Sequence, residues 1–118
     1  MGDAMLTLPT TEVDALEGDQ LVAAGAVLLD VRELDEWTAG HAPAAVHLPL
    51  GSLGSAPVDE WDSRHVVVIC RSGNRSRTAT DALRARGVDA MNLAGGMRAW
   101  ESVGLPAVTP AGGAGRVA

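Results

Sequence analysis

Short apolar runs alternate with amphipathic stretches along most of the 118-residue chain. Two runs, AVLLDV (residues 26–31) and HVVVIC (65–70), show the unbroken apolar pattern of strands buried on both faces. The second is the clearer, because four of its consecutive residues are β-branched. VDAMNL (88–93) is predicted as a further strand, and shorter extended pieces are expected at 11–14 and 44–50.

Helices are predicted between these strands. Their expected positions are residues 16–24, 32–40, 76–86 and 95–104. In the second of them Leu34 and Trp37 share one face, because they are one helical turn apart. The Gly/Ser/Pro-rich stretch 51–64 is predicted as a connecting loop that Trp61 pins to the body.

Strands that alternate with short helices predict βαβ units, and hence an α/β fold with a mostly parallel sheet covered on both faces. In such sheets, ligands bind beyond the carboxyl ends of the strands. The only cysteine, Cys70, stands at a carboxyl end, where a strand leads into a helix. The predicted fold and the position of the thiol therefore indicate the same edge of the sheet.

Composition narrows the class of partner. Hydrophobic residues make up 47% of the chain and charged residues 20%, as in a globular domain, and three Trp are the only large aromatic side chains for its core. The net charge of -6 disfavours nucleic acid and anionic membranes as partners. All nine basic residues are Arg, and Arg71, Arg75 and Arg77 lie beside Cys70. A cationic cluster in an acidic chain is a candidate anion site, although charge runs are usually solvated.

The single cysteine also limits the chemistry. An intrachain disulfide is excluded, and without a His/Cys tract at ligand spacing we expect neither a metal nor a cofactor. The first ten residues, MGDAMLTLPT, have no basic region followed by an apolar one, so they predict no secretory signal. We expect the chain to be a monomer. We also expect it in the cytoplasm, where a lone thiol stays reduced.

The residues after Cys70 predict a cradle for an anion. Gly73 and Asn74 adopt positive φ most readily, which would turn successive N–H groups inward. The start of the following helix adds partial positive charge, so a sulfur held there is expected to be a thiolate. Arg71 and Arg75 would add cationic donors for an anionic substrate.

Two serines complete this loop and leave alternatives open. Ser72 and Ser76 are candidate hydroxyl donors to the sulfur, although Ser76 is also a candidate helix N-cap. Cys70 itself could be a small apolar filler, but the polar, arginine-flanked turn that follows favours a nucleophile. Cysteine phosphatases need Arg at the position that Ser76 occupies here. A shorter turn suits a thiolate that carries one extra sulfur better than it suits a phosphoryl group.

Three pieces, in order, resemble the rhodanese family of sulfurtransferases: LLDVRELDEWTAGHAPAAVHLPL, VVVICRSGNRS and NLAGGMRAWESVGLP. The resemblance covers residues 11–106, which leaves 1–10 as a flexible lead-in and 107–118 as a mobile Gly/Ala/Pro-rich tail. It implies a single-domain, rhodanese-like three-layer fold with a mostly parallel five-stranded sheet. One departure is Ala44, where the family often has Gly, and it affects only the local turn.

The resemblance also implies a ping-pong reaction. Cys70 would take a sulfane sulfur from thiosulfate or a similar small anionic donor, hold it as a persulfide, and pass it to cyanide or a thiol, including that of a protein. Backbone N–H groups of residues 71–75 would stabilise the persulfide, while Arg71 and Arg75 would bind the donor. Asp30 and Arg32, which end a strand, are expected to support the site as an ion pair or by bracing a loop rather than to act in catalysis.

Two other functions stay open at this point. The first is a persulfide-carrying or redox-sensing interaction module, which would use the same loop chemistry with little turnover of small donors. The second is a cysteine phosphatase or arsenate reductase. Enzymes of those kinds with this fold carry one more residue in the loop.

Overall fold

The computed structural model describes residues 11–118, so the lead-in expected for residues 1–10 lies outside the described part of the chain. Five parallel strands form one sheet in the order β1-β5-β4-β2-β3. They are β1 (Glu12–Val13), β2 (Val27–Asp30), β3 (Val46–His47), β4 (His65–Ile69) and β5 (Asp89–Leu93). Each lies inside a predicted extended segment. The predicted α/β class and the five-stranded parallel sheet are confirmed.

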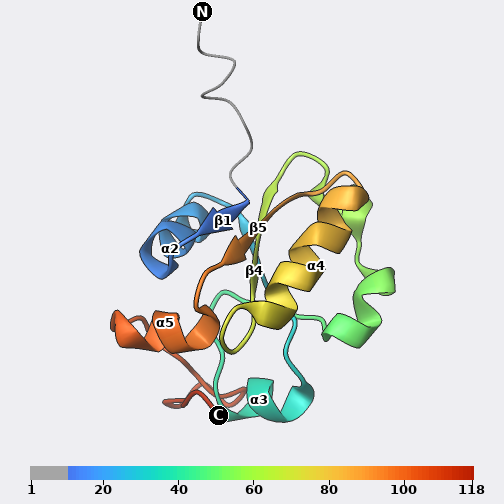
Figure 1. The fold of residues 1–118 in the computed structure, drawn as a ribbon. Coiled ribbons are helices and arrows are strands. Elements are labelled where there is room, and N and C mark those ends of the chain that lie inside the picture. Colours follow the sequence, from blue (N-terminus) through green and yellow to red (C-terminus); the bar gives the residue numbers. More distant parts are fainter. Residues whose placement is uncertain (1–10) are drawn as a thin grey trace, which may run out of the picture.

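Helices cover both faces of this sheet, so that the sheet is the middle one of three layers (Figure 1). They are α2 (Ala15–Ala23), α3 (Leu34–Ala39), α4 (Asn74–Ala85) and α5 (Gly96–Ser102), with two 3₁₀ helices, η1 (Leu50–Ser55) and η2 (Val58–Trp61), in the predicted loop. Two of them, α2 and α5, lie on one face, while α4 and η1 lie on the other. Trp61 is buried, as predicted.

The central strand β4 divides its side chains between the two halves of the core. Val66, Val68 and Cys70 join the cluster under α4, whereas Val67 and Ile69 join the cluster under α2 and α5. This division follows from the alternation of side chains along a strand. Cys70 therefore points toward α4, the helix that the chain forms next.

The short helix α3 differs from its prediction. None of its residues is buried, and Leu34 is 65% exposed, because α3 lies across the carboxyl end of the sheet rather than on a face (Figure 1). Trp37 is only partly buried and stacks on His41, with ring centroids 3.5 Å apart. The expectation of three core tryptophans is right for Trp61 and Trp100 and wrong for Trp37.

Residues 107–118 lie back against the carboxyl end of the sheet, beside α3 (Figure 1). Val108 forms antiparallel bridges with His41 and with Ala114. The Arg116 N–H donates to the Ala39 carbonyl at 3.0 Å. The composition predicted a mobile tail because few side chains there can pack, yet in the structure backbone groups make these contacts.

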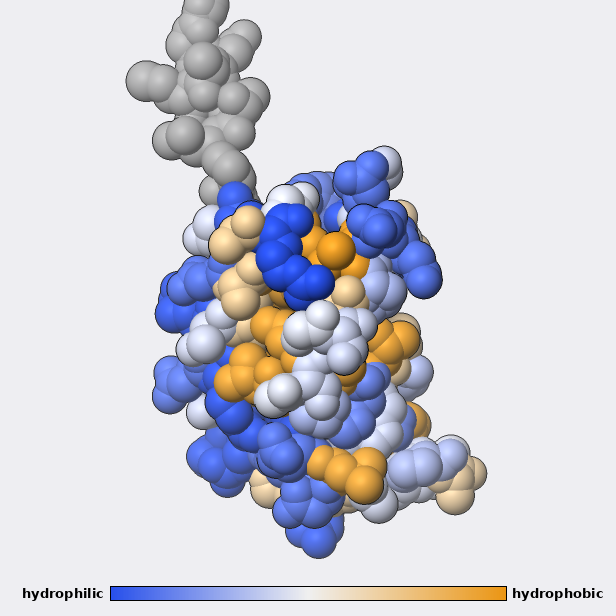
Figure 2. Space-filling model, turned by 90° about the vertical axis from the view of Figure 1, so that its right-hand side faces the viewer, coloured by the Kyte–Doolittle hydropathy of each residue, from blue (hydrophilic) through white to orange (hydrophobic). Residues whose placement is uncertain are grey.

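Figure 2 views the side that carries η1 and η2, and it shows small apolar patches separated by polar side chains. Within residues 11–118, no helix is both long enough and apolar enough to cross a membrane.

Candidate active site

The chain turns from β4 into α4 within the Cys70 loop, which we define as residues 70–76. Gly73 has φ 106° and precedes the first residue of α4, Asn74. The positive φ predicted for Gly73 is confirmed. The positive φ predicted for Asn74 is wrong, because Asn74 is the first helical residue and only glycines have positive φ among the described residues. The helix thus begins two residues earlier than predicted.

The first turn of α5 holds the start of this loop from the other side. The Met97 N–H donates to the Cys70 carbonyl at 2.7 Å, and the Arg98 N–H donates to the Arg71 carbonyl at 3.0 Å. The chain can come this close because residue 96 is glycine: a Cβ on Gly96 would lie 2.3 Å from the Cys70 carbonyl oxygen. Gly96 of the NLAGGMRAW stretch therefore lets α5 approach the active loop.

The sulfur lies inside the loop, and Cys70 is only 1% exposed. Its Sγ accepts hydrogen bonds from the Gly73 N–H at 3.1 Å and from the Ser76 hydroxyl at 3.2 Å. Ser76 is fully buried in the first turn of α4, so the hydroxyl-donor role predicted for it fits the structure and the N-cap alternative is wrong. Ser72, the other predicted hydroxyl donor, is exposed.

Burial and hydrogen bonding act on the thiol in opposite directions. Burial is the largest single influence and raises the pKa of Cys70, because it removes water from the charged form. The Ser76 hydroxyl and the N–H groups of Ser76, Gly73 and Ser72 together outweigh burial, and the pKa of Cys70 is lowered from its ordinary value. The loop thus favours a thiolate, the form of cysteine that acts as a nucleophile.

A buried asparagine that the sequence analysis missed stands behind Ser76. Asn92 of β5 is 2% exposed, and its Oδ1 lies 2.5 Å from Ser76 Oγ. Its Nδ2 donates to the Gly73 carbonyl at 3.2 Å and to Glu12 Oε2 of β1 at 3.0 Å. The one available signal was a polar residue inside the apolar run VDAMNL.

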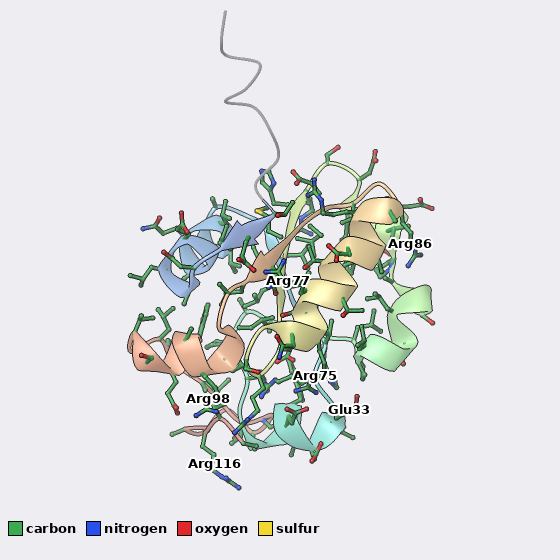
Figure 3. The ribbon with its side chains drawn as sticks, in the orientation of Figure 1. Glu33, Arg75, Arg77, Arg86, Arg98 and Arg116 are labelled. Atoms are coloured by element: carbon green, nitrogen blue, oxygen red, sulfur yellow. The ribbon has the colours of Figure 1, made fainter. Side chains whose placement is uncertain are left out.

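Arg75 is bound on the opposite side of the loop. Its guanidinium makes two hydrogen bonds to the Glu36 carboxylate of α3, at 2.7 and 2.8 Å. These bonds are the largest influence on Glu36 and lower the pKa of that carboxyl to about 2. The sequence placed Arg75 at the mouth as an open cation, whereas in the structure it also ties α3 to the loop (Figure 3). Glu36 was missed, because nothing local links it to a residue so far along the chain.

The other two arginines of the predicted cluster have partners in different parts of the molecule. Arg71 is exposed, and its Nε donates to the Ala118 carbonyl at 2.7 Å. Arg77 points away from α3 and pairs with Glu12 (Figure 3). The structure therefore does not assemble the three arginines into one cationic patch.

Asp30 and Arg32 form a buried ion pair, as expected. Both are 0% exposed; Arg32 Nη2 lies 2.8 Å from Asp30 Oδ2 and also donates to the Gly40 carbonyl at 2.8 Å. This pair ties the end of β2 to the end of α3. Neither side chain is among the hydrogen-bond partners of Cys70 in the described residues, so the geometry supports a bracing role.

Two further features bear on what the site can hold. Within residues 11–118, no group of three or more His, Cys, Asp or Glu side chains could hold a metal ion. A pocket of about 540 Å³ lies at the β3 edge, between Val46, Trp61 and Arg64, and no residue of the Cys70 loop lines it.

Comparison with known proteins shows which proteins resemble this chain. The family model of the rhodanese-like domain matches residues 11–103. The uncharacterized protein slr1261 of Synechocystis is 39% identical over 83 residues, which are 70% of this chain and 46% of that protein. The chain thus spans about half the length of this curated relative.

Two solved structures show the same likeness. A rhodanese-related protein from Thermoplasma volcanium superposes with a TM-score of 0.75 at 28% identity, over 82% of this chain and 96% of that one. The human single-domain sulfurtransferase TSTD1 gives a TM-score of 0.70 at 29% identity, over 79% of this chain and 96% of that one.

Proposed function

The chain belongs to the rhodanese-like family, and on this premise we propose that it is a sulfurtransferase that carries a sulfane sulfur on Cys70. The observation that carries the proposal is the set of donors around the sulfur: the Gly73 N–H and the Ser76 hydroxyl both point at Sγ. Such donors stabilise a sulfur anion, and the start of α4 adds its partial positive charge.

The first half-reaction loads the sulfur. The Cys70 thiolate attacks the outer sulfur of thiosulfate or of a similar anionic donor. A new S–S bond forms at Sγ, the old S–S bond breaks, and sulfite leaves with the electron pair. The negative charge then resides on the outer sulfur of the persulfide, within reach of the N–H groups of the loop.

The second half-reaction delivers the sulfur. A nucleophile such as cyanide or a thiolate attacks the outer sulfur, the bond to Sγ breaks, and the electron pair returns to Cys70. The donors that stabilised the nucleophile in the first half now stabilise the same sulfur as a leaving group. No net oxidation is needed, because the donor supplies sulfur already at the sulfane level.

We propose that the small donor is an anion and that Arg71, at the exposed start of the loop, is its first contact. Arg75 would assist from its position against Glu36. The acceptor is cyanide, a small thiol or a protein thiol. We place this chemistry in the cytoplasm, where reducing conditions keep a lone cysteine as a thiol.

A carrier module that receives its persulfide from another protein is the second candidate. The observation that favours it is the likeness to a Bacillus subtilis relative, 35% identical over 74 residues, whose name reads "Putative sulfur carrier protein YrkF". Rapid loading from a protein persulfide, with slow turnover of thiosulfate, would favour this candidate. The phosphatase alternative is disfavoured because Ser76 takes the position of the arginine that those enzymes require.

The test is an intact-mass measurement after incubation with thiosulfate. We expect the purified protein to gain the mass of one sulfur atom and to lose it on addition of cyanide. The Cys70→Ser variant should gain none. If the native protein gains no sulfur from thiosulfate or from a protein persulfide, or if the variant gains as much, the proposal is wrong.

A further inference from the structure

One hydroxyl proton faces two acceptors beside the sulfur. Ser76 Oγ lies 3.2 Å from Cys70 Sγ and 2.5 Å from Asn92 Oδ1. A serine hydroxyl has a single proton to donate, and an amide oxygen has none. Ser76 can therefore donate to the sulfur or to Asn92, but not to both at once.

The orientation of the Asn92 amide is defined by its other contacts. Nδ2 donates to the Gly73 carbonyl at 3.2 Å and to the Glu12 carboxylate at 3.0 Å. Both partners accept hydrogen bonds only, so Oδ1 must be the atom that faces Ser76. Two oxygens 2.5 Å apart require a proton between them. In this arrangement the Ser76 hydroxyl donates to Asn92 Oδ1 and offers a lone pair to Cys70. In the alternative arrangement, which the 3.2 Å distance to Sγ allows, the same hydroxyl donates to the sulfur.

We propose that Asn92 is a positioning residue that competes with Cys70 for the Ser76 proton. When Cys70 is a neutral thiol, its S–H donates to Ser76 Oγ and the Ser76 O–H donates to Asn92 Oδ1. When Cys70 is a thiolate, the hydroxyl rotates to the sulfur and leaves the buried Oδ1 without a donor. An unsatisfied buried acceptor costs free energy, so Asn92 favours the neutral thiol.

This competition has a consequence for sulfur transfer. The inference rests on the proposed function only in that Cys70 must become an anion twice in each cycle, as nucleophile and as leaving group. Ser76 would turn to the sulfur at those two moments and return to Asn92 between them. Asn92 thus limits the time during which an unloaded thiolate is exposed to alkylating or oxidising agents.

Charged side chains also stand in the loop and on the elements packed around this hydrogen-bond chain. They are Arg71 in the loop, Arg75 and Arg77 on α4, Glu36 on α3, Glu12 on β1, the Asp30–Arg32 pair at the end of β2, and Arg98 on α5. A double-mutant cycle on Ser76 and Asn92 leaves all of them in place. Their contribution to the pKa of Cys70 therefore cancels in the comparison.

The experiment measures the pKa of Cys70 from the pH dependence of its alkylation by iodoacetamide, with no sulfur donor present. We expect Asn92→Leu, which keeps the volume and removes the acceptor, to lower that pKa by about one unit and to speed alkylation at low pH about tenfold. Ser76→Ala should raise the pKa, because the thiolate loses a donor. In the Ser76→Ala background, Asn92→Leu should change the pKa by less than about 0.3 units.

The results of this alkylation experiment can overturn the proposal. If Asn92→Leu raises the pKa, or shifts it equally with and without Ser76, Asn92 acts by holding the loop and the proposal is wrong. Thr78→Ala, at an exposed position of α4, is the matched control and should change nothing. Failure to form a persulfide would overturn the proposed function and leave this titration intact.

A measurement on the native protein covers the case in which Asn92→Leu does not fold. The Asn92 side-chain amide resonances should move with pH at the midpoint at which Cys70 titrates, because Oδ1 loses its donor there. The same resonances should stay nearly constant in Ser76→Ala. A native spectrum in which they do not follow Cys70 would overturn the proposal.

Discussion

The side of the Cys70 loop that faces the sheet and the side that faces α3 are built from different interactions. Toward the sheet, Ser76 and Asn92 are buried and uncharged, at 0% and 2% exposure. Toward α3, Arg75 and Glu36 are charged, and the Arg75 side chain is 35% exposed. Buried neutral hydrogen bonds respond little to salt, whereas partly exposed ion pairs respond to both salt and pH. If the proposed function holds, the inner side would tune the sulfur and the outer side would meet the approaching donor.

The largest effect is expected on the inner side, from Gly96→Ala. The new Cβ would lie 2.3 Å from the Cys70 carbonyl oxygen, at a residue with φ +58°, so the loop would have to move. We expect a loss of about 3 kcal/mol or more in unfolding free energy, and a loss of persulfide formation in any protein that folds. Urea unfolding and intact mass would measure the two effects.

Gly54→Ala is the matched control for this change, because a Cβ there meets nothing within 4 Å. It should leave both the stability and the loading of sulfur close to native. If Gly96→Ala behaves like Gly54→Ala, the contact between α5 and the loop does not shape the site.

Arg75→Ala tests the outer side and should have the next largest effect. We expect kcat/KM for thiosulfate to fall about tenfold, since one charge-assisted contact to the donor is lost, with a smaller loss of stability. Steady-state kinetics at several thiosulfate concentrations would measure it. Glu36→Gln separates the two roles of Arg75, because it releases the guanidinium and keeps its charge.

For a donor-binding Arg75, Glu36→Gln should leave kcat/KM unchanged or raise it, while Arg75→Ala lowers it. Equal losses in both variants would instead assign Arg75 to bracing α3. If the Arg75→Ala variant fails to fold, that result would also contradict a donor-binding role for Arg75.

Acid should weaken the ion pair on the outer side. The pKa of Glu36 is lowered from 4.5 to about 2, so the stabilisation by its pair with Arg75 is fully present above pH 4.5 and is lost as the pH falls toward about 2. Because both side chains are partly exposed, we expect only about 1–2 kcal/mol from this pair. Urea unfolding between pH 6 and pH 3 would measure it.

Glu36→Gln is the control for this pH dependence. Its stability should already be lower than native at pH 6, and the difference between the two proteins should shrink with acid. A difference that stays constant down to pH 3 would contradict the lowered pKa.

The smallest effect is expected from Arg77→Ala. Arg77 stands two positions after Arg75 in the sequence, yet it pairs with Glu12 on the other side of α4, where both side chains are exposed. Exposed pairs contribute about 0–1 kcal/mol, so stability and loading should stay near native. A tenfold fall in kcat/KM for thiosulfate would place Arg77 at the mouth and remove the contrast between these two arginines.

Local patterns were enough to predict the strands and the reactive loop. Every strand lies within a predicted extended segment. The signal is strongest for β2, β4 and β5, because strands buried in a parallel sheet carry long apolar runs. The start of α4 was predicted two residues late, because Gly73 and Asn74 look equally suited to a turn. Only Gly73 takes positive φ, and a helical Asn74 brings Ser76 onto the face of α4 that meets the sulfur.

By itself, the sequence determined the α/β class, the parallel sheet and the placement of one thiol at a strand-to-helix junction, since these follow from periodicity and turn residues close along the chain. Only the tertiary structure decided which side chains surround that thiol. Asn92 reaches Ser76 from the neighbouring strand, and Glu36 reaches Arg75 from a helix formed 39 residues earlier. Hydrogen bonds and ion pairs of this kind depend on distances in space, which no local pattern records.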